Sequence, residues 1–187
     1  MDVPDSIQYR AIVAHTPLEG QVAFRSMTGS EGLSRLFEFD VELIADNYNL
    51  DLDALLGKPL TLEMETQSGS RFLDGHVTRC EMIGRESGTS RHYIYRATVR
   101  PWLWYLTQTS DSKIFQKKTV PDVIAEVLGE YGFAFESKLT GAYRTWEYCV
   151  QYQETDFAFL SRLMEHEGIY YYFKHGNGQH TLVMVDD

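Results

Sequence analysis

Apolar and polar residues alternate along several short segments of the first hundred residues. A period of two is typical of a β-strand that buries one face and exposes the other. The segments predicted as strands are residues 7–14, 21–28, 37–43, 59–66, 71–83 and 91–99. Short strands at this spacing, with turn residues between them, indicate a small β-barrel or a strongly curled antiparallel sheet.

Two local features interrupt the alternation. Residues 51–56 are predicted to form a short helix, because Asp51 can cap its start and Gly57 can end it. Gly75 lies inside the predicted strand 71–83, where an isolated glycine indicates a possible β-bulge.

After residue 107 the pattern changes to the spacing of amphipathic helices. Residues 119–131 are predicted as a helix, with Thr119 and Asp122 as a variant capping box and Pro121 in the first turn. One continuous apolar stripe runs along it, consisting of Val120, Val123, Ile124, Val127, Leu128 and Tyr131. This spacing predicts a helix that buries one face.

A second helix is predicted inside residues 144–173, between two strands. The first strand covers residues 146–152, and the hydroxyl of Thr155 can then cap the helix start. Asp156 adds a negative charge to the first turn, where the helix dipole favours it. Gly168 suits the left-handed residue that ends a helix, and residues 169–173 resume as a strand.

Further short strands are predicted at residues 133–135 and 180–185, with a hairpin turn at 174–179. The expected fold class is therefore α+β and mainly β: a small β-barrel or curled antiparallel sheet, followed by an α+β unit with two amphipathic helices. The expected domains are residues 1–106 and 107–187.

An aromatic cluster marks the junction between these domains. It contains Pro101, Trp102 and Trp104. Its apolar flanks favour a packed junction, and the alternative is a platform on which bases or sugars stack.

Composition narrows the function classes. The chain has 187 residues and a formal net charge of −10, which disfavours a nucleic-acid partner because phosphate binding relies on Lys and Arg. No apolar run approaches the length of a membrane span, and the N-terminus lacks the pattern of a secretory signal. Cys80 and Cys149 are expected to be reduced thiols.

The candidates for catalytic or metal-binding side chains are acidic residues and histidines. Glu38, Asp40 and Glu42 alternate on one strand and are expected to form a solvated face. The run 165–167 and His175 resemble metal ligands, but adjacent helix residues point in different directions. We therefore predict no catalytic, metal-binding or cofactor-binding residue.

The segment 150–173 resembles the signature of the VgrG family, the spike proteins of bacterial type VI secretion systems. The matching residues, here called the signature residues, are Tyr152, Glu154, Thr155, Asp156, Phe159, Arg162, Leu163, Glu165 and Gly168. Similar family segments occur at residues 36–43, 55–62, 100–124 and 180–187. Gln153 and His166 depart from the common pattern. Glu154 and Asp156 are expected to be architectural, binding the free N–H groups at the helix start.

The resemblance implies a fold like a phage baseplate hub and a structural, non-enzymatic function. It also implies a homotrimer that caps the Hcp tube, carries a PAAR-type tip protein or an effector, and is propelled from the bacterial cytoplasm into a target cell. The family continues beyond residue 187, so this chain is expected to be a part of such a protein that forms no stable trimer alone. The alternatives are a carbohydrate- or peptidoglycan-binding or hydrolysing module, and a phage tail hub.

Overall fold

The computed structural model of the protein describes residues 11–86 and 92–187. It contains two compact units. The first consists of the described residues up to Glu31 together with Phe37–Pro101 and His175–His180, and the second of Gly32–Leu36, Trp102–Lys174 and Thr181–Asp187. Neither unit is continuous in sequence, and the predicted domain boundary after residue 106 stays a prediction. Residues 7–10 of the first predicted strand lie outside the described part.

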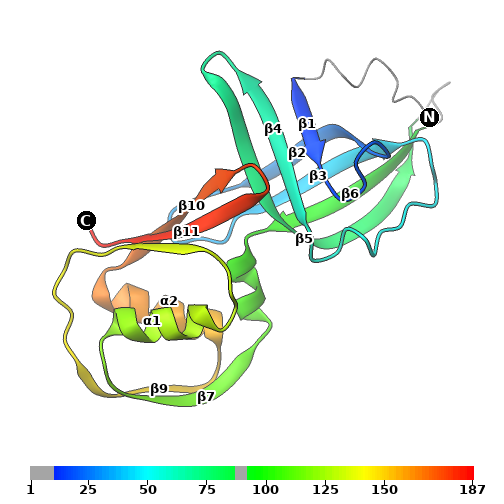
Figure 1. Cartoon of the computed structure of the whole chain (residues 1–187). Coiled ribbons are helices and arrows are strands. Elements are labelled where there is room, and N and C mark those ends of the chain that lie inside the picture. Colours follow the sequence, from blue (N-terminus) through cyan, green and yellow to red (C-terminus); the bar gives the residue numbers. More distant parts are fainter. Residues whose placement is uncertain (1–10, 87–91) are drawn as a thin grey trace. The chain divides into compact units, whose positions relative to one another are not determined.

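The first unit is built on a six-stranded antiparallel sheet that curls into a half-barrel (Figure 1). The strand order is β1-β4-β5-β6-β3-β2. The strands are β1 (Ile12–His15), β2 (Ala23–Ser30), β3 (Glu38–Ala45), β4 (Pro59–Thr66), β5 (Gly69–Arg85) and β6 (Tyr93–Arg100). The expected curled antiparallel sheet is confirmed.

The core of this unit is formed by the apolar side chains that alternate along the strands and share one face of the sheet. Phe37, Leu43 and Val77 are fully buried, as the period of two predicts. The acidic residues of β3 lie on the opposite face and are paired across the strands. Glu42 binds Arg25 and Arg96, and the other two bind Thr98 and Arg100. The predicted solvated face is therefore a ladder of cross-strand pairs.

The prediction of a bulge at Gly75 was wrong. Gly75 pairs in regular register with Leu60, and the register shifts of β5 occur beyond it, between Val77 and Arg79 and between Met82 and Gly84. Gly75 is needed for space. A Cβ atom built there would lie 2.7 Å from Cγ1 of Val99 and 2.9 Å from Cε2 of Phe37.

The predicted helix at residues 51–56 was also wrong, because the segment consists of turns. The carboxylate of Asp51 does accept a hydrogen bond from the N–H of Ala54, at 3.4 Å. Gly57 follows too soon, in a left-handed conformation. So short a segment cannot repay the cost of helix nucleation.

The second unit contains a two-stranded and a three-stranded sheet with two helices (Figure 1). Its elements are a 3₁₀ helix (Trp102–Thr107), β7 (Ser110–Lys118), α1 (Val120–Gly129), β8 (Phe135–Lys138), β9 (Trp146–Thr155), α2 (Asp156–Glu167), β10 (Tyr170–Gly176) and β11 (Gln179–Val185). β7 pairs with β9, and β11 lies between β10 and β8. β7 was not predicted. The tip of the β10–β11 hairpin, His175–His180, belongs to the first unit.

The helix ends follow the sequence closely. Thr119 and Asp122 form the expected capping box of α1, and Pro121 lies in its first turn. The hydroxyl of Thr155 accepts the N–H of Ala158 at the start of α2. Gly168 ends α2 with a φ of 73°, the left-handed conformation expected there. Of the helices in the described residues, none combines the length and hydrophobicity that crossing a bilayer requires.

Replacing Gly75 tests the close packing of β5. We expect Gly75→Ala to lower the free energy of unfolding by about 1–3 kcal/mol, because the methyl group must displace core side chains. Gly84→Ala, in the same strand with open space around its Cβ position, is the matched control and should change stability little. Urea unfolding measures both variants. Equal stabilities would contradict this account of Gly75.

Candidate functional site in the second unit

The candidate site is formed by β7, β9 and the start of α2, where most of the signature residues lie. The inner face of the β7–β9 sheet packs against the helices. Phe115 of β7 stacks on Phe159 of α2, with ring centroids 5.5 Å apart. Cys149 and Gln151 of β9 are buried on the same face. This packing fixes the strand that leads directly into α2.

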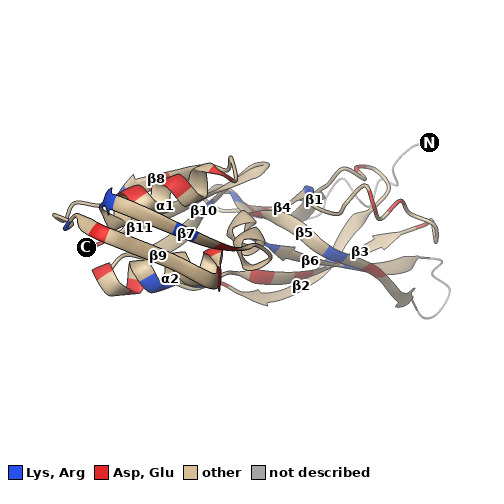
Figure 2. Ribbon diagram, turned by 90° about the horizontal axis from the view of Figure 1, so that it is seen from below, with Lys and Arg blue, Asp and Glu red and all other residues tan. Residues whose placement is uncertain are grey.

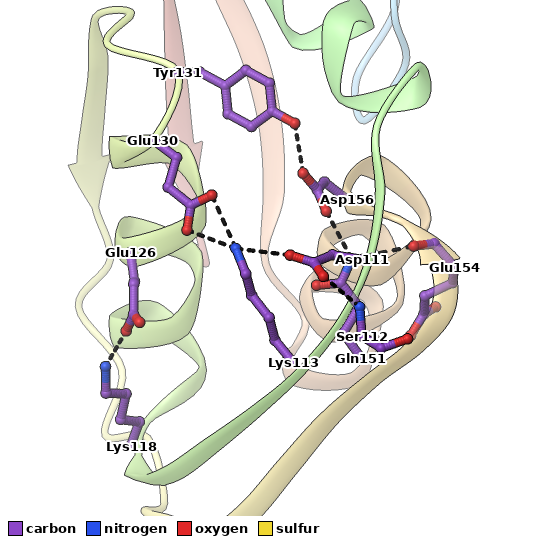
Figure 3. Close-up of polar contacts among 10 residues, drawn as sticks. All are labelled: Asp111, Ser112, Lys113, Lys118, Glu126, Glu130, Tyr131, Gln151, Glu154 and Asp156. Carbon is purple, nitrogen blue, oxygen red and sulfur yellow. Dashed lines mark hydrogen bonds and ion pairs between the residues drawn. The ribbon is translucent and has the colours of Figure 1, made fainter.

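Asp156 is the buried acidic residue of this site, with only 4% of its surface exposed. Its carboxylate accepts a hydrogen bond from the hydroxyl of Tyr131 at 2.5 Å and one from the amide of Gln151 at 2.7 Å (Figure 3). Its backbone N–H donates to the carbonyl of Thr109 at 3.1 Å. Asp156 therefore connects α2 with β9, with the segment after α1 and with the segment before β7.

The carboxylate of Glu154 binds Arg162, nearly two turns into α2. A guanidinium N–H donates to its carboxylate at 2.5 Å, and the same group donates to the carbonyl of Val150 at 3.3 Å. The hydrogen bond to Glu154 raises the pKa of Arg162. The expectation that Glu154 and Asp156 bind the free N–H groups of the helix start was wrong. Both carboxylates accept side-chain donors, and Thr155 supplies the cap.

Two lysines of β7 bind acidic residues of or next to α1. The ammonium of Lys113 lies 2.8 Å from Glu130 and 3.1 Å from Asp111 (Figure 3). These hydrogen bonds raise the pKa of Lys113. Lys118 pairs in the same way with Glu126. The charges at this side of β7 are thus directed toward α1.

The remaining signature residues divide between core and surface. Phe159 and Leu163 are buried in the helical core, whereas Glu165 is exposed. Tyr152 is 70% exposed and points away from the helices, opposite in register to Ser112.

Tyr152 belongs to a face that the sequence did not reveal. We call it the outer face: the alternate side chains of β7 and β9 on the side away from α1 and α2. These side chains are Ser112, Ile114 and Gln116 of β7 and Tyr148, Val150 and Tyr152 of β9. Figure 2 shows the two strands side by side, with charged positions on both of them. This face was not predicted from the sequence because β7, which supplies half of its side chains, was not predicted.

The aromatic junction cluster is mainly structural. Trp102 is 1% exposed and stacks on Phe133, with centroids 5.2 Å apart. Pro101 is also buried, while Trp104 is half-buried beside Tyr105. A buried ring cannot offer its face to a base or sugar, so the stacking interpretation was wrong for Trp102.

The residues considered as metal ligands belong to different units. His175 belongs to the first unit, where it contacts Glu31, whereas residues 165–167 belong to the second. Sequence reasoning missed a buried polar group in the first unit. Asp74 and His180, each about 1% exposed in its side chain, are hydrogen-bonded at 2.8 Å, and Thr61 donates to the same carboxylate. Both free cysteines carry a raised pKa caused mainly by burial, which keeps the thiols protonated.

The model of the phage tail baseplate hub (GPD) family matches residues 30–187. The chain belongs to this family. The match covers the strand β9, the helix α2 and the outer face just described, so the candidate site is a part of the hub domain.

Similar proteins of known name are VgrG proteins. The chain is 48% identical to the type VI secretion system spike protein VgrG1a of Pseudomonas aeruginosa over 95% of its own length, but spans only 28% of that relative. The actin cross-linking toxin VgrG1 of Vibrio cholerae is 33% identical, and 14% of it is covered.

A solved structure has the same fold. It is the Escherichia coli c3393 protein, described as a component of the type VI secretion system with structural similarity to the T4 bacteriophage tail proteins gp27 and gp5. Its TM-score is 0.76 at 22% identity, over 89% of this chain and 49% of that one. The expected fold like a phage hub is confirmed.

The hydrogen bond between Tyr131 and Asp156 can be tested by Tyr131→Phe. We expect a loss of about 1–3 kcal/mol in the free energy of unfolding, because the buried carboxylate keeps only one side-chain donor. Burial, followed by the bond to Asp156, raises the pKa of Tyr131 from 10 to about 12. A raised pKa stabilises the fold below pH 10, and this stabilisation is lost as the pH rises through 12.

The difference between wild type and Tyr131→Phe should therefore be largest at neutral pH and shrink above pH 10. Urea unfolding at several pH values measures it. Tyr148→Phe, at an exposed tyrosine of the outer face, is the control and should match wild type at neutral pH. A difference that stays constant to pH 12 would count against the raised pKa.

Proposed function

We propose that this chain is the N-terminal hub part of a type VI secretion spike, in which three copies cap the Hcp tube. The observation that carries the proposal is the 48% identity with the VgrG1a spike protein over 95% of the chain. Because the chain spans only 28% of that relative, the activity and partners of the whole protein are part of the proposal.

The proposed role is mechanical support and symmetry adaptation between a trimer and a sixfold tube. The structure suits this role because charged groups of the candidate site are bound within the protein. The carboxylates of Glu154 and Asp156 accept hydrogen bonds from Arg162, Tyr131 and Gln151. Groups held in this way stiffen the junction of strand and helix and are poorly placed for proton transfer to a substrate.

The proposed partners are a second and third copy of the chain, the Hcp tube protein and, through other parts of the spike, a PAAR-type tip protein or an effector. The protein would remain in the bacterial cytoplasm until the type VI system exports it. The actin cross-linking toxin VgrG1 matches this chain over only 14% of its length, so toxin chemistry is not proposed for the hub part.

The alternative of a carbohydrate-binding or peptidoglycan-hydrolysing module is not supported by Trp102, because that ring is buried. A phage tail hub is supported by the family description, and the genes beside this one would separate it from a secretion spike.

The proposal is tested by the mass of the complete gene product in light scattering, alone and mixed with Hcp rings. We expect three copies per particle and one spike bound per ring stack, while the 187-residue chain alone is smaller than a trimer. Three copies would carry a formal charge of −30 (3 × −10), which opposes association of the chain alone. A monomeric complete product that ignores Hcp would refute the proposed function.

A further inference from the structure

The outer face gathers exposed apolar side chains on two adjacent strands. Ile114 is 63% exposed, Tyr148 64%, Val150 47% and Tyr152 70%. Ile114 lies opposite Val150 in the register of the sheet. Side chains opposite one another on the same face are neighbours, so the four lie in one patch, with Ser112 opposite Tyr152 and Gln116 opposite Tyr148.

The six side chains of the outer face are uncharged, in a chain in which 24% of residues are charged. The series ends at Lys118, the next alternate position of β7, which pairs with Glu126. Three charged residues of the two strands form ion pairs with residues on or beside the helices. Lys113 binds Glu130, Lys118 binds Glu126, and Glu154 binds Arg162 of α2 (Figure 3). Strands that meet only water commonly carry charges, especially Lys, whereas the centre of a protein interface is depleted in charge and rich in Tyr.

The uncharged outer face is best suited to contact a second copy of this chain. Each copy has a formal net charge of −10, so two copies repel one another across most of their surfaces. Repulsion and the cost of desolvating charges are lowest where a neutral apolar face is presented. We propose that the outer face of β7 and β9 contacts a neighbouring copy in the spike trimer, an inference that rests on the proposed function.

The size of the patch sets the expected strength of the contact. Four such side chains expose on the order of 500 Å² of surface, given 150–250 Å² for a large aromatic residue. An ordinary interface buries about 800 Å² per partner. The outer face therefore supplies the apolar centre of a contact, and the 187-residue chain alone should associate weakly through it.

A photo-crosslinking experiment detects weak contacts. Benzoylphenylalanine replaces Tyr152, and in a separate variant Tyr48, which lies in the first unit and is equally exposed at 69%. We expect irradiation of the concentrated chain to give covalent dimers from position 152, at least tenfold more than from position 48. Equal yields at the two positions, or links from position 152 only within its own chain, would overturn the proposal.

A charge in the patch gives a second readout. Val150→Lys should lower the yield from position 152 at least tenfold, because the lysine must be desolvated in the contact. Ile83→Lys, at an exposed apolar residue of β5, is the matched control and should leave the yield unchanged. Circular dichroism verifies that both variants fold. An unchanged yield in Val150→Lys would refute the contact.

The complete gene product separates this proposal from the proposed function. A complete product with Val150 intact that forms a trimer and binds Hcp, but gives no links from position 152 between copies, would sink the outer-face contact alone. A monomeric complete product whose 187-residue chain still gives the position-152 links would sink the spike function and keep the contact.

Discussion

A carboxylate buried at the start of α2 sets the arrangement of the second unit. Asp156 is almost without solvent, so its charge must be compensated by donors inside the protein. Tyr131 and Gln151 supply them from the segment after α1 and from β9. Because both donors must be in place at once, the positions of two helices and a strand depend on one another. Two ion pairs add further links: Lys113 of β7 binds Glu130 after α1, and Arg162 of α2 binds Glu154 of β9.

This arrangement also explains the surface of the sheet. Lys113 and Lys118 of β7 and Glu154 of β9 bind partners on or beside the helices, and the six side chains of the outer face are neutral. A hub protein of high negative charge thereby obtains one face that another acidic molecule can approach. The same residues serve internal stability and external contact, through the two faces of one sheet.

Much of the fold follows from local pattern. The strand at residues 59–66, the capping box of Thr119 and the caps at Thr155 and Gly168 are found where the sequence places them, because each depends on neighbouring residues. β7 was missed because its polar sequence carries few apolar residues, with Ile114 exposed and Phe115 buried, and its identity as a strand depends on pairing with distant β9. Gly75 was misread because the crowding by Val99 and Phe37 exists only after folding.

The candidate site was predicted in part. The signature residues lie on β9 and α2 as expected, but the partners of Asp156 could not be foreseen, since Tyr131 is 25 positions away in sequence. The outer face needed the register of two strands, which no local pattern contains. The buried pair of Asp74 and His180 was hidden for the same reason.

That last pair has a consequence for synthesis on the ribosome. Asp74 and His180 are separated by 106 positions, and the first unit includes His175–His180 from the tip of the β10–β11 hairpin. While residues up to about 101 emerge, the carboxylate of Asp74 has Thr61 but lacks the imidazole that it meets in the finished protein. The first unit to be translated is therefore among the last to be completed, and a nascent chain released before residue 180 would contain a sheet whose central Asp74 lacks its imidazole partner.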